Sequence, residues 1–368
     1  GEIQTGDRSD YAISYDYEEI ISYLGAFVSL EQVNDNSSYY LSANYSTQSH
    51  QKEDFFFNYG KMPKVTNDGF NIKIGGSVNL SENSKAYANY GLYDRQPFHS
   101  ALFSNERYSN DLNPDVKNEE ITGFELGYAY EKSNFRAIID LYSTKWGNRI
   151  LVSSSFDDGQ LQSFSRTSNV EQVHIGAEAQ IVYQPSNEFI LRAYASVGDW
   201  KYNNNVTSTS YDETGQQIAQ GGTLYLEDVK VGGPAQTTFG FELTSRLNES
   251  TTLDISLNHY ADQYGYADWE DGVDELPSVF SQPNNAGTPK LPDYTLVDAS
   301  LNYVIPAGSN ELQARLSVYN LFDQFYVEQM FDNDAMSPSE YSWKGLNVEN
   351  DVDIGFGRTW TLGLTYRF

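Results

Sequence analysis

The final segment of the chain, residues 357–368, alternates strictly between apolar and polar side chains. Its apolar and aromatic residues are Trp360, Leu362, Leu364, Tyr366 and Phe368, and a threonine, glycine or arginine separates each from the next. Successive side chains of a β-strand point to opposite faces of the sheet, so one face of this segment is entirely apolar. Such a strand, with an aromatic residue at its end, is typical of the closing strand of a transmembrane β-barrel.

The same alternation recurs along the whole chain and indicates about thirteen strands. The strands are centred on alternating residues at about 19–31, 39–45, 72–80, 86–92, 124–130, 135–142, 175–183, 189–197, 239–243, 253–258, 297–303, 312–319 and 357–368. Short turns and long loops alternate between them. Four of the loops fall at roughly 50–69, 96–118, 202–234 and 321–356, a third loop precedes the strand near 175–183, and a fifth loop precedes the strand near 297–303. We therefore expect hairpins whose short turns lie at one end of the sheet and whose long loops lie at the other.

Three features favour an antiparallel transmembrane β-barrel over a soluble β-sandwich. The alternating segments are about 10–13 residues long, whereas strands of globular proteins average about 5–6 residues. The asymmetry between turns and loops matches the short periplasmic turns and long extracellular loops of outer-membrane barrels. Aromatic residues near the short-turn ends, namely Tyr130, Tyr183, Tyr303 and Phe368, fit an interfacial aromatic belt. The predicted fold is all-β.

An odd number of strands is unexpected, because single-chain bacterial barrels have even numbers. The last strand follows a long loop, so it runs inward and places the C-terminus in the periplasm, and the first strand runs inward as well. Residues 1–18 then read as the end of an outer loop. We expect residues 1–368 to be the C-terminal part of a larger barrel.

Composition excludes several classes of function. There is no cysteine, so disulfides, thiolate catalysis and cysteine-based metal sites are ruled out. The 23 basic residues stand against 51 acidic ones, with a formal charge of −28, which argues against nucleic acid as a partner. No stretch reaches the roughly 20 apolar residues of a membrane-spanning helix.

Sequence motifs give little support for catalysis. The four histidines, His50, His99, His174 and His259, are dispersed, and none has the HExxH spacing of a zinc protease. Neither a G-x-S-x-G nucleophile elbow nor a P-loop is present. His174 and His259 fall within strands, where a lumen or interface role is expected. We predict that the chain is not an enzyme and has no metal site or cofactor, although a surface-exposed barrel hydrolase remains a distant alternative.

The fifth and sixth loops combine acidic and aromatic residues. Their acids are Asp262, Asp268, Glu270, Asp271, Asp274 and Glu275, followed by Asp332, Asp334, Glu340, Glu349, Asp351 and Asp353. Oxygen ligands of this kind suit Ca²⁺, but neither run has EF-hand spacing, and solvated loops are the simpler interpretation. A negative mouth would repel anions and accept neutral or cationic solutes. The candidate ligand-binding residues, which could stack on a ligand, are Tyr264, Tyr266, Trp269, Tyr341 and Trp343.

Three stretches resemble the TonB-dependent outer-membrane receptors. D-R-Q-P-F-H-S at 94–100 and L-N-P-D-V-K-N-E-E-I-T-G-F-E-L-G-Y-A-Y at 112–130 resemble paired boxes around one outer loop. V-Y-N-L-F-D-Q-F-Y at 318–326 resembles the family's N-L-F-D-x-x-Y signature, and residues 360–368 resemble its closing strand. The motif residues carried over are Asn113, Pro114, Glu125, Asn320, Leu321, Phe322, Asp323, Tyr326 and Phe368.

The resemblance implies a 22-stranded barrel that surrounds an N-terminal plug. It also implies TonB-coupled import of a scarce ligand, such as an iron chelate, haem, cobalamin, glycan or peptide, across the outer membrane of a Gram-negative bacterium. The plug and roughly the first nine strands are expected to be absent from this sequence. The expected partners are the lipid bilayer, lipopolysaccharide, TonB through the absent N-terminal region, and a surface lipoprotein or other subunits of an outer-membrane complex. A passive or structural barrel subunit is the alternative function.

Two further expectations follow. His99 lies between the two boxes, where haem receptors of the family carry a functional histidine, but the first box departs from the usual Phe-Arg-Ala-Pro, and a structural role is the simpler interpretation. The alternation also predicts the orientation of individual side chains. Arg136, Arg192 and Arg315 should point into the lumen, whereas Ile139, Leu191 and Leu316 should face lipid.

Overall fold

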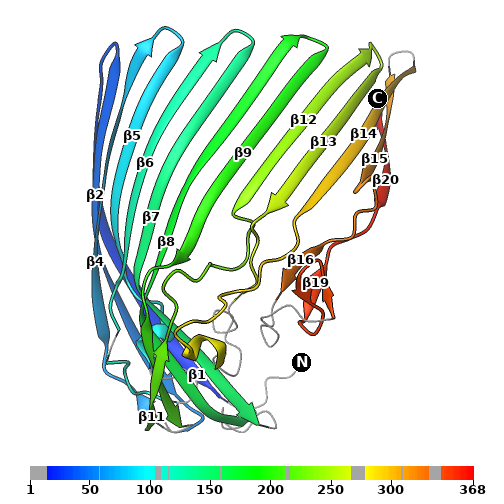
Figure 1. Ribbon diagram of the computed structural model, residues 1–368. Helices are drawn as coiled ribbons and strands as arrows, with labels where there is room; N and C mark the ends of the chain where they lie inside the picture. Colours follow the sequence, from blue (N-terminus) through cyan, green and yellow to red (C-terminus); the bar gives the residue numbers. More distant parts are fainter. Residues whose placement is uncertain are drawn as a thin grey trace.

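The chain forms a large, curved antiparallel sheet in a computed structural model (Figure 1). The structure describes residues 15–57, 59–103, 109–114, 116–157, 160–212, 216–266, 278–307, 310–330 and 341–368. Thirteen strands follow one another in the sheet, in sequence order, within these residues. The predicted all-β antiparallel fold and the predicted number of strands are therefore confirmed.

The thirteen strands of the continuous sheet are β1 (Tyr17–Val33), β2 (Ser37–Asp54), β4 (Val65–Ser81), β5 (Ser84–Arg95), β6 (Glu119–Lys132), β7 (Phe135–Asp157), β8 (Gln160–Ser186), β9 (Phe189–Tyr202), β12 (Thr237–Asn248), β13 (Thr251–Ala261), β14 (Tyr294–Ala307), β15 (Asn310–Tyr319) and β20 (Thr359–Arg367). The shorter elements are β3 (Gly60–Lys61), β10 (Val206–Asp212), β11 (Gln217–Leu224), β16 (Val327–Met330), β17 (Ser342–Trp343), β18 (Leu346–Asn347), β19 (Val352–Ile354) and the 3₁₀ turns η2 (Ser100–Leu102) and η4 (Ser278–Ser281). None of the helices in the described ranges is both long and apolar enough to cross a membrane.

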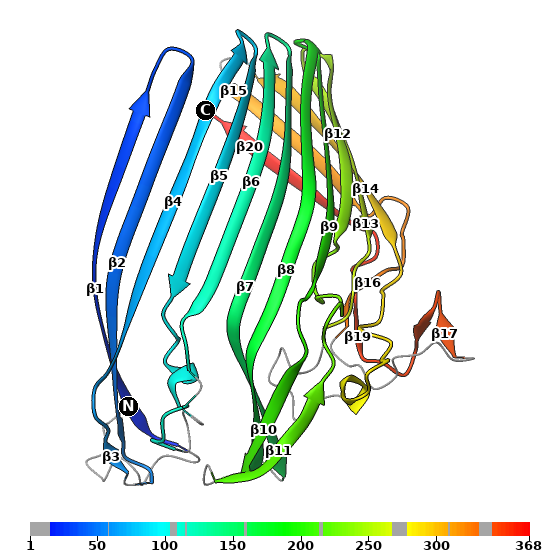
Figure 2. The ribbon, with the colours of Figure 1, turned by 60° about the vertical axis from the view of Figure 1, so that its left-hand side comes forward.

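The last strand pairs as expected. β20 lies against β15, with Arg367 opposite Glu311 and Thr359 opposite Tyr319. β1 and β20 are the two ends of the strand order, and the sheet is open between them in the described structure (Figure 2).

The strands share one end with short turns, which we call the turn end, and an opposite end with longer connections, the loop end (Figure 1). One expected loop is wrong. The third loop, expected before the strand near 175–183, is mostly strand, because β7 and β8 continue past Trp146 and pair as far as Asp157 opposite Gln160. Bulges interrupt their ladder between Trp146 and Leu151, and Asn148 and Asn169 adopt positive φ angles. These irregularities break the two-residue period, which is why alternation alone indicated a loop.

The two faces of the sheet differ as predicted. Large apolar side chains on one face are exposed, including Ile139 at 51% and Leu316 at 43%. Leu191 shares this face, because it lies opposite Tyr183 and Leu243. Arg192 and Arg315 lie on the other, polar face, which is hollowed. The register places Arg136 on this face too, opposite Glu131 and four residues from Asp140 on the same strand.

The buried apolar residues of the described chain lie at the loop end and not along the sheet. One cluster joins Val170, Tyr202, Leu226 and Phe280, and it connects β8 and β9 to the fourth and fifth loops. A second cluster includes Leu291, Val327, Met330 and Leu346, and a third includes Met62, Leu102 and Phe103. Among the described residues, none forms a protein layer over the apolar face of the strands, as expected for a surface that contacts lipid.

Candidate functional site

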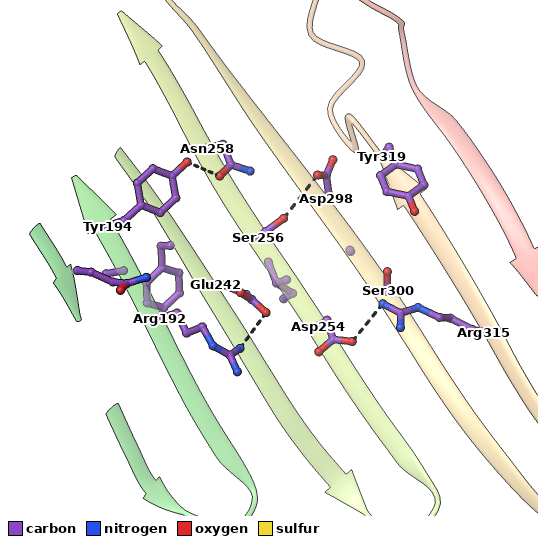
Figure 3. Close-up of a pocket in the computed structure, with 15 residues that line it drawn as sticks. Arg192, Tyr194, Glu242, Asp254, Ser256, Asn258, Asp298, Ser300, Arg315 and Tyr319 are labelled. Carbon is purple, nitrogen blue, oxygen red and sulfur yellow. Dashed lines mark hydrogen bonds and ion pairs between the residues drawn. The ribbon is translucent and has the colours of Figure 1, made fainter. Parts of the chain in front are cut away.

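The polar face is hollowed over strands β8, β9, β12, β13, β14 and β15. The hollow has a volume of about 690 Å³ and is lined mainly by charged, amide and hydroxyl side chains (Figure 3). The hairpins β8–β9, β12–β13 and β14–β15 position these residues, because every second residue of each strand projects from this face. We call this surface the polar wall.

Two ion pairs cross strands in the polar wall, one between the neighbours β9 and β12 and one from β15 past β14 to β13. Nη1 of Arg192 lies 3.0 Å from Oε1 of Glu242, and Nη2 of Arg315 lies 3.6 Å from Oδ2 of Asp254 (Figure 3). All four side chains are partly exposed, so each pair contributes at most about 1 kcal/mol to stability. Asp298 accepts a hydrogen bond of 2.8 Å from the backbone N–H of Asn320. The wall thus presents both signs of charge to the hollow.

A row of four tyrosines, Tyr40, Tyr87, Tyr142 and Tyr194, runs across the same face; we call it the tyrosine row. Each ring covers a glycine on the next strand, and the glycines are Gly75, Gly127, Gly176 and Gly240. A β-carbon at any of these glycines would lie within 2.0–2.6 Å of the tyrosine that covers it. Only glycine allows an approach this close.

Each hydroxyl of the tyrosine row reaches the second strand along. Tyr40 donates to Asn89 at 2.9 Å and Tyr194 donates to Asn258 at 2.8 Å, while Tyr142 accepts from the Trp200 indole at 2.9 Å. Tyr87 donates to Asp140. The row therefore connects β2 to β5, β5 to β7, β7 to β9 and β9 to β13, and it stiffens the wall across the strands.

Three carboxylates lie together on this face, and we call Glu125, Asp140 and Glu178 the acid patch. Asp140 lies directly opposite Glu178 in the ladder of β7 and β8. Asn89 donates to Glu125 at 2.8 Å. Within the described ranges no lysine or arginine lies within 4.0 Å of these three carboxylates. Carboxylates without counter-charges attract cationic groups to this part of the wall.

The N-L-F-D motif forms the exit from β15. Asn320 and Asp323 adopt positive φ angles of 48° and 57°. The Asn320 side chain accepts from the Gln324 N–H at 2.8 Å and donates to the Gln324 and Phe356 carbonyls at 2.9 and 3.1 Å. Asp323 accepts from the Arg358 N–H at 2.8 Å, immediately before β20. The motif thus folds the sixth loop back onto the closing strand.

The other motif residues lie apart from one another. Asn113 is buried and donates to the Ala101 carbonyl at 3.1 Å, so it fixes the second loop. Tyr326 stacks on Tyr294 with ring centres 4.5 Å apart. Phe322 and Phe368 are 75% and 100% exposed. Pro114 lies in a turn, and Leu321 donates its N–H to the Val297 carbonyl.

Comparison with known proteins gives the decisive observation. The family model for the TonB dependent receptor-like β-barrel matches residues 4–321. The chain belongs to this family. Members of the family form β-barrels of the Gram-negative outer membrane, where they act as transporters and receptors.

Solved structures share the fold of this receptor barrel. It is similar to the siderophore receptor PiuA from Acinetobacter baumannii, with 13% identity, a TM-score of 0.63, and coverage of 96% of this chain and 44% of PiuA. The copper transporter OprC has 15% sequence identity and a TM-score of 0.60, and the match covers 95% of this chain and 49% of OprC. The ferric citrate transporter FecA has 14% sequence identity and a TM-score of 0.59, and the match covers 96% of this chain and 46% of FecA. The chain thus spans less than half of each. No curated protein matches it.

The loop aromatics predicted to bind ligand mostly take part in loop packing of the receptor. The backbone of Tyr264 forms an isolated antiparallel β-bridge with that of Lys290, and Tyr266 donates its backbone N–H to the Met330 carbonyl at 3.2 Å. Trp343 contacts Phe325 edge-on at 5.1 Å and packs on the cluster around Met330. Tyr341 is 63% exposed. Trp269 lies outside the described residues. Their role in ligand binding stays a prediction.

The acidic loops are only partly described. Asp262 accepts from Lys290 and from the Thr237 hydroxyl, both at 2.8 Å. Glu349, Asp351 and Asp353 are exposed. The remaining acids of both loops, 268–275 and 332–340, lie outside the described residues. Among the residues that are described, no three His, Asp or Glu side chains are placed to share a metal ion.

Proposed function

We propose that residues 1–368 form the C-terminal part of an outer-membrane import barrel whose transport is coupled to TonB. The observation that carries this proposal is the two-faced sheet of thirteen strands, which exposes apolar side chains on one face and a hollowed polar wall on the other. A sheet of this kind is stable where lipid covers the first face and water or a plug fills the space behind the second. Membership of the receptor family supports the same function.

The orientation follows from this proposal. The apolar face contacts the lipid bilayer and, in the outer leaflet, lipopolysaccharide. The loop end lies outside the cell, and the turn end, with the C-terminus, lies in the periplasm. TonB engages an N-terminal plug that belongs to the same importer, and the clustered loops offer a surface to a lipoprotein or another outer-membrane subunit.

The polar wall and the acid patch favour neutral or cationic cargo. The wall balances Arg192 and Arg315 against Glu242, Asp254 and Asp298, and the acid patch adds carboxylates without counter-charges nearby. A lumen of this sign raises the local concentration of cations and lowers that of anions. Scarce metal chelates of low negative charge are the proposed cargo class, since similar structures include a copper transporter and a siderophore receptor.

Uptake measurements test the proposal. Cells that encode the protein are compared with a strain that lacks its gene and a strain that lacks TonB, using labelled cationic, neutral and anionic iron chelates, cobalamin and oligosaccharides. Uptake of at least one ligand should require both the gene and TonB. Uptake that needs the gene but not TonB would instead indicate a passive pore. Uptake of every ligand that requires neither the gene nor TonB would instead indicate that the protein is a structural subunit of an outer-membrane complex.

A further inference from the structure

Two histidines that are far apart in the sequence lie against each other at the loop end. His50 is near the end of β2, and His99 precedes η2 in the second loop. Both are buried, with exposed fractions of 0% and 7%, and their Nδ1 atoms are 3.1 Å apart. The contact therefore joins the second loop to the sheet. It was not expected from the sequence, because nothing local indicates that residues 49 positions apart will meet.

The neighbouring groups fix which nitrogen of each ring carries the proton. The Gln48 side-chain nitrogen lies 2.8 Å from Nε2 of His50. An amide N–H donates, so Nε2 of His50 accepts, and the proton of this neutral ring is on Nδ1. Nδ1 of His50 then donates to Nδ1 of His99. The proton of His99 is on Nε2, which lies at an ion-pair distance of 3.5 Å from Oε1 of Glu19. Donors and acceptors therefore match while both rings are neutral.

A second proton on His99 does not fit this arrangement. It would bind at Nδ1 and face the Nδ1–H of His50 across 3.1 Å, so the hydrogen bond between the rings would be lost. The imidazolium would also lie near another cation. The Nζ atom of Lys52 and the ring centre of His99 are each 4.8 Å from the ring centre of Phe103. Lys52 is fully buried, so water screens the repulsion between the two charges only weakly.

The surrounding charges leave the neutral ring favoured. Around His99 and Lys52 the described titratable groups are Glu19 and Tyr17 on β1 and His50 and Asp54 on β2. Glu19 favours the imidazolium, but burial first, and then His50 and Lys52, lower the pKa of His99 to about 4. An exposed histidine binds its proton more tightly. Falling pH therefore favours any state in which this ring is released from the sheet.

We propose that the contact between His50 and His99 is an acid-sensitive latch, which holds the second loop on β1 and β2 at neutral pH and releases it when His99 takes up a proton. Lys52 belongs to the closed latch, because its ammonium donates to the Ser109 carbonyl of the same loop at 2.9 Å. The pH outside the cell then controls this part of the barrel mouth. That location rests on the proposed function, whereas the latch itself rests only on the local contacts.

Thiol labelling of the full chain in detergent micelles tests the latch without reference to transport. The chain has no cysteine. Ser109→Cys places one thiol at a loop position that is 4% exposed, and Ser100→Cys places one at an exposed position of the same loop. The ratio of their reaction rates with dithiodipyridine measures how often the loop opens. If His99 has an ordinary pKa of about 6.5 in the open loop, the ratio should rise roughly thirtyfold from about pH 7.5 to about pH 5.

Further substitutions in these labelled chains assign the rise to His99. His99→Asn places an amide oxygen where Nδ1 accepts from His50, and the amide does not take up a proton in this pH range, so most of the rise should be lost. Lys52→Met removes the nearby ammonium. It should raise the pKa of His99 in the closed loop and so make the rise smaller.

His259→Gln is the matched control, because this ring stacks on Phe239 of β12 and bonds Thr295 of β14, and the full rise should remain. A labelling ratio that stays constant between about pH 7.5 and about pH 5 in the chain with both histidines would overturn the proposal. An equal rise in His99→Asn would do the same. If His99→Asn does not fold, an undiminished rise in Lys52→Met overturns the proposal in its place.

Discussion

At the scale of single residues, the glycines beneath the tyrosine row affect stability, because the tyrosine rings leave no room for a β-carbon at these positions. A β-carbon at Gly127 would lie 2.0 Å from Cζ of Tyr87, whereas one at Gly123, on the same face of β6, would meet nothing within 4 Å. Gly127→Ala should therefore lower the free energy of unfolding by about 1–3 kcal/mol through overpacking. Gly123→Ala should be neutral or slightly stabilising. Thermal unfolding in micelles measures both, and Tyr87→Ala should rescue Gly127→Ala if the clash is the cause.

A second prediction for single residues concerns pH. The hydrogen bond from Lys290, and then that from Thr237, lowers the pKa of Asp262 below its ordinary value. Asp262 therefore stabilises the fold fully above pH of about 3.9 and loses this contribution as the pH falls through its lowered pKa. Asp262→Asn should lower the melting temperature at pH 7, and the difference from wild type should shrink below pH of about 4. The control is Asp293→Asn. The wild-type Asp293 carboxylate is 3.5 Å from Lys290, and its removal should lower the melting temperature less.

Side-chain orientation was predictable from the sequence, but contacts between strands were not. The alternation assigned Arg192 and Leu316 to the correct faces, because orientation along a strand depends only on the two-residue period. The partners of Tyr87 or His50 depend on register and on loop paths, which are set by residues far away along the chain. The sequence signal that could have found the tyrosine row is the recurrence of glycine on the polar face of successive strands.

At the scale of elements, the turn after β15 determines how the sixth loop returns to β20. Asn320 holds it with three side-chain hydrogen bonds at a positive φ angle. Asn320→Ala should cost about 2–4 kcal/mol, because these bonds are lost and alanine is strained in this conformation. Hydrogen exchange should show faster exchange for the amides of β20. Phe322→Ala, at a side chain that is 75% exposed, should leave those amides protected, and equal exchange in both variants would contradict this role for Asn320.

The elements also show where the two-residue period fails as a predictor. Alternation predicts a loop where β7 and β8 extend, because bulges and left-handed asparagines shift the two-residue period. β10 nevertheless pairs with β8 there and continues the sheet. The N-L-F-D motif coincides with the end of β15, where the Asn320 side chain bonds locally to Gln324. A local sequence motif can predict hydrogen bonds between neighbouring residues, whereas strand pairing that continues past bulges cannot be predicted from alternation.

At the scale of the whole molecule, the central prediction is that one face of the sheet contacts lipid and the other contacts water. The chain contains no cysteine, so single substitutions introduce unique labels. Leu316→Cys on the apolar face should react with a membrane-soluble maleimide, whereas Arg315→Cys on the polar wall should react with a charged, water-soluble one. Their neighbouring positions on β15 make each the control for the other, because depth in the bilayer is nearly the same and only the face differs. Labelling of the full chain in liposomes, read by mass spectrometry, measures both reactions. Equal reaction of both cysteines with the water-soluble reagent would mean that lipid does not cover the apolar face, and the transmembrane arrangement would then be wrong.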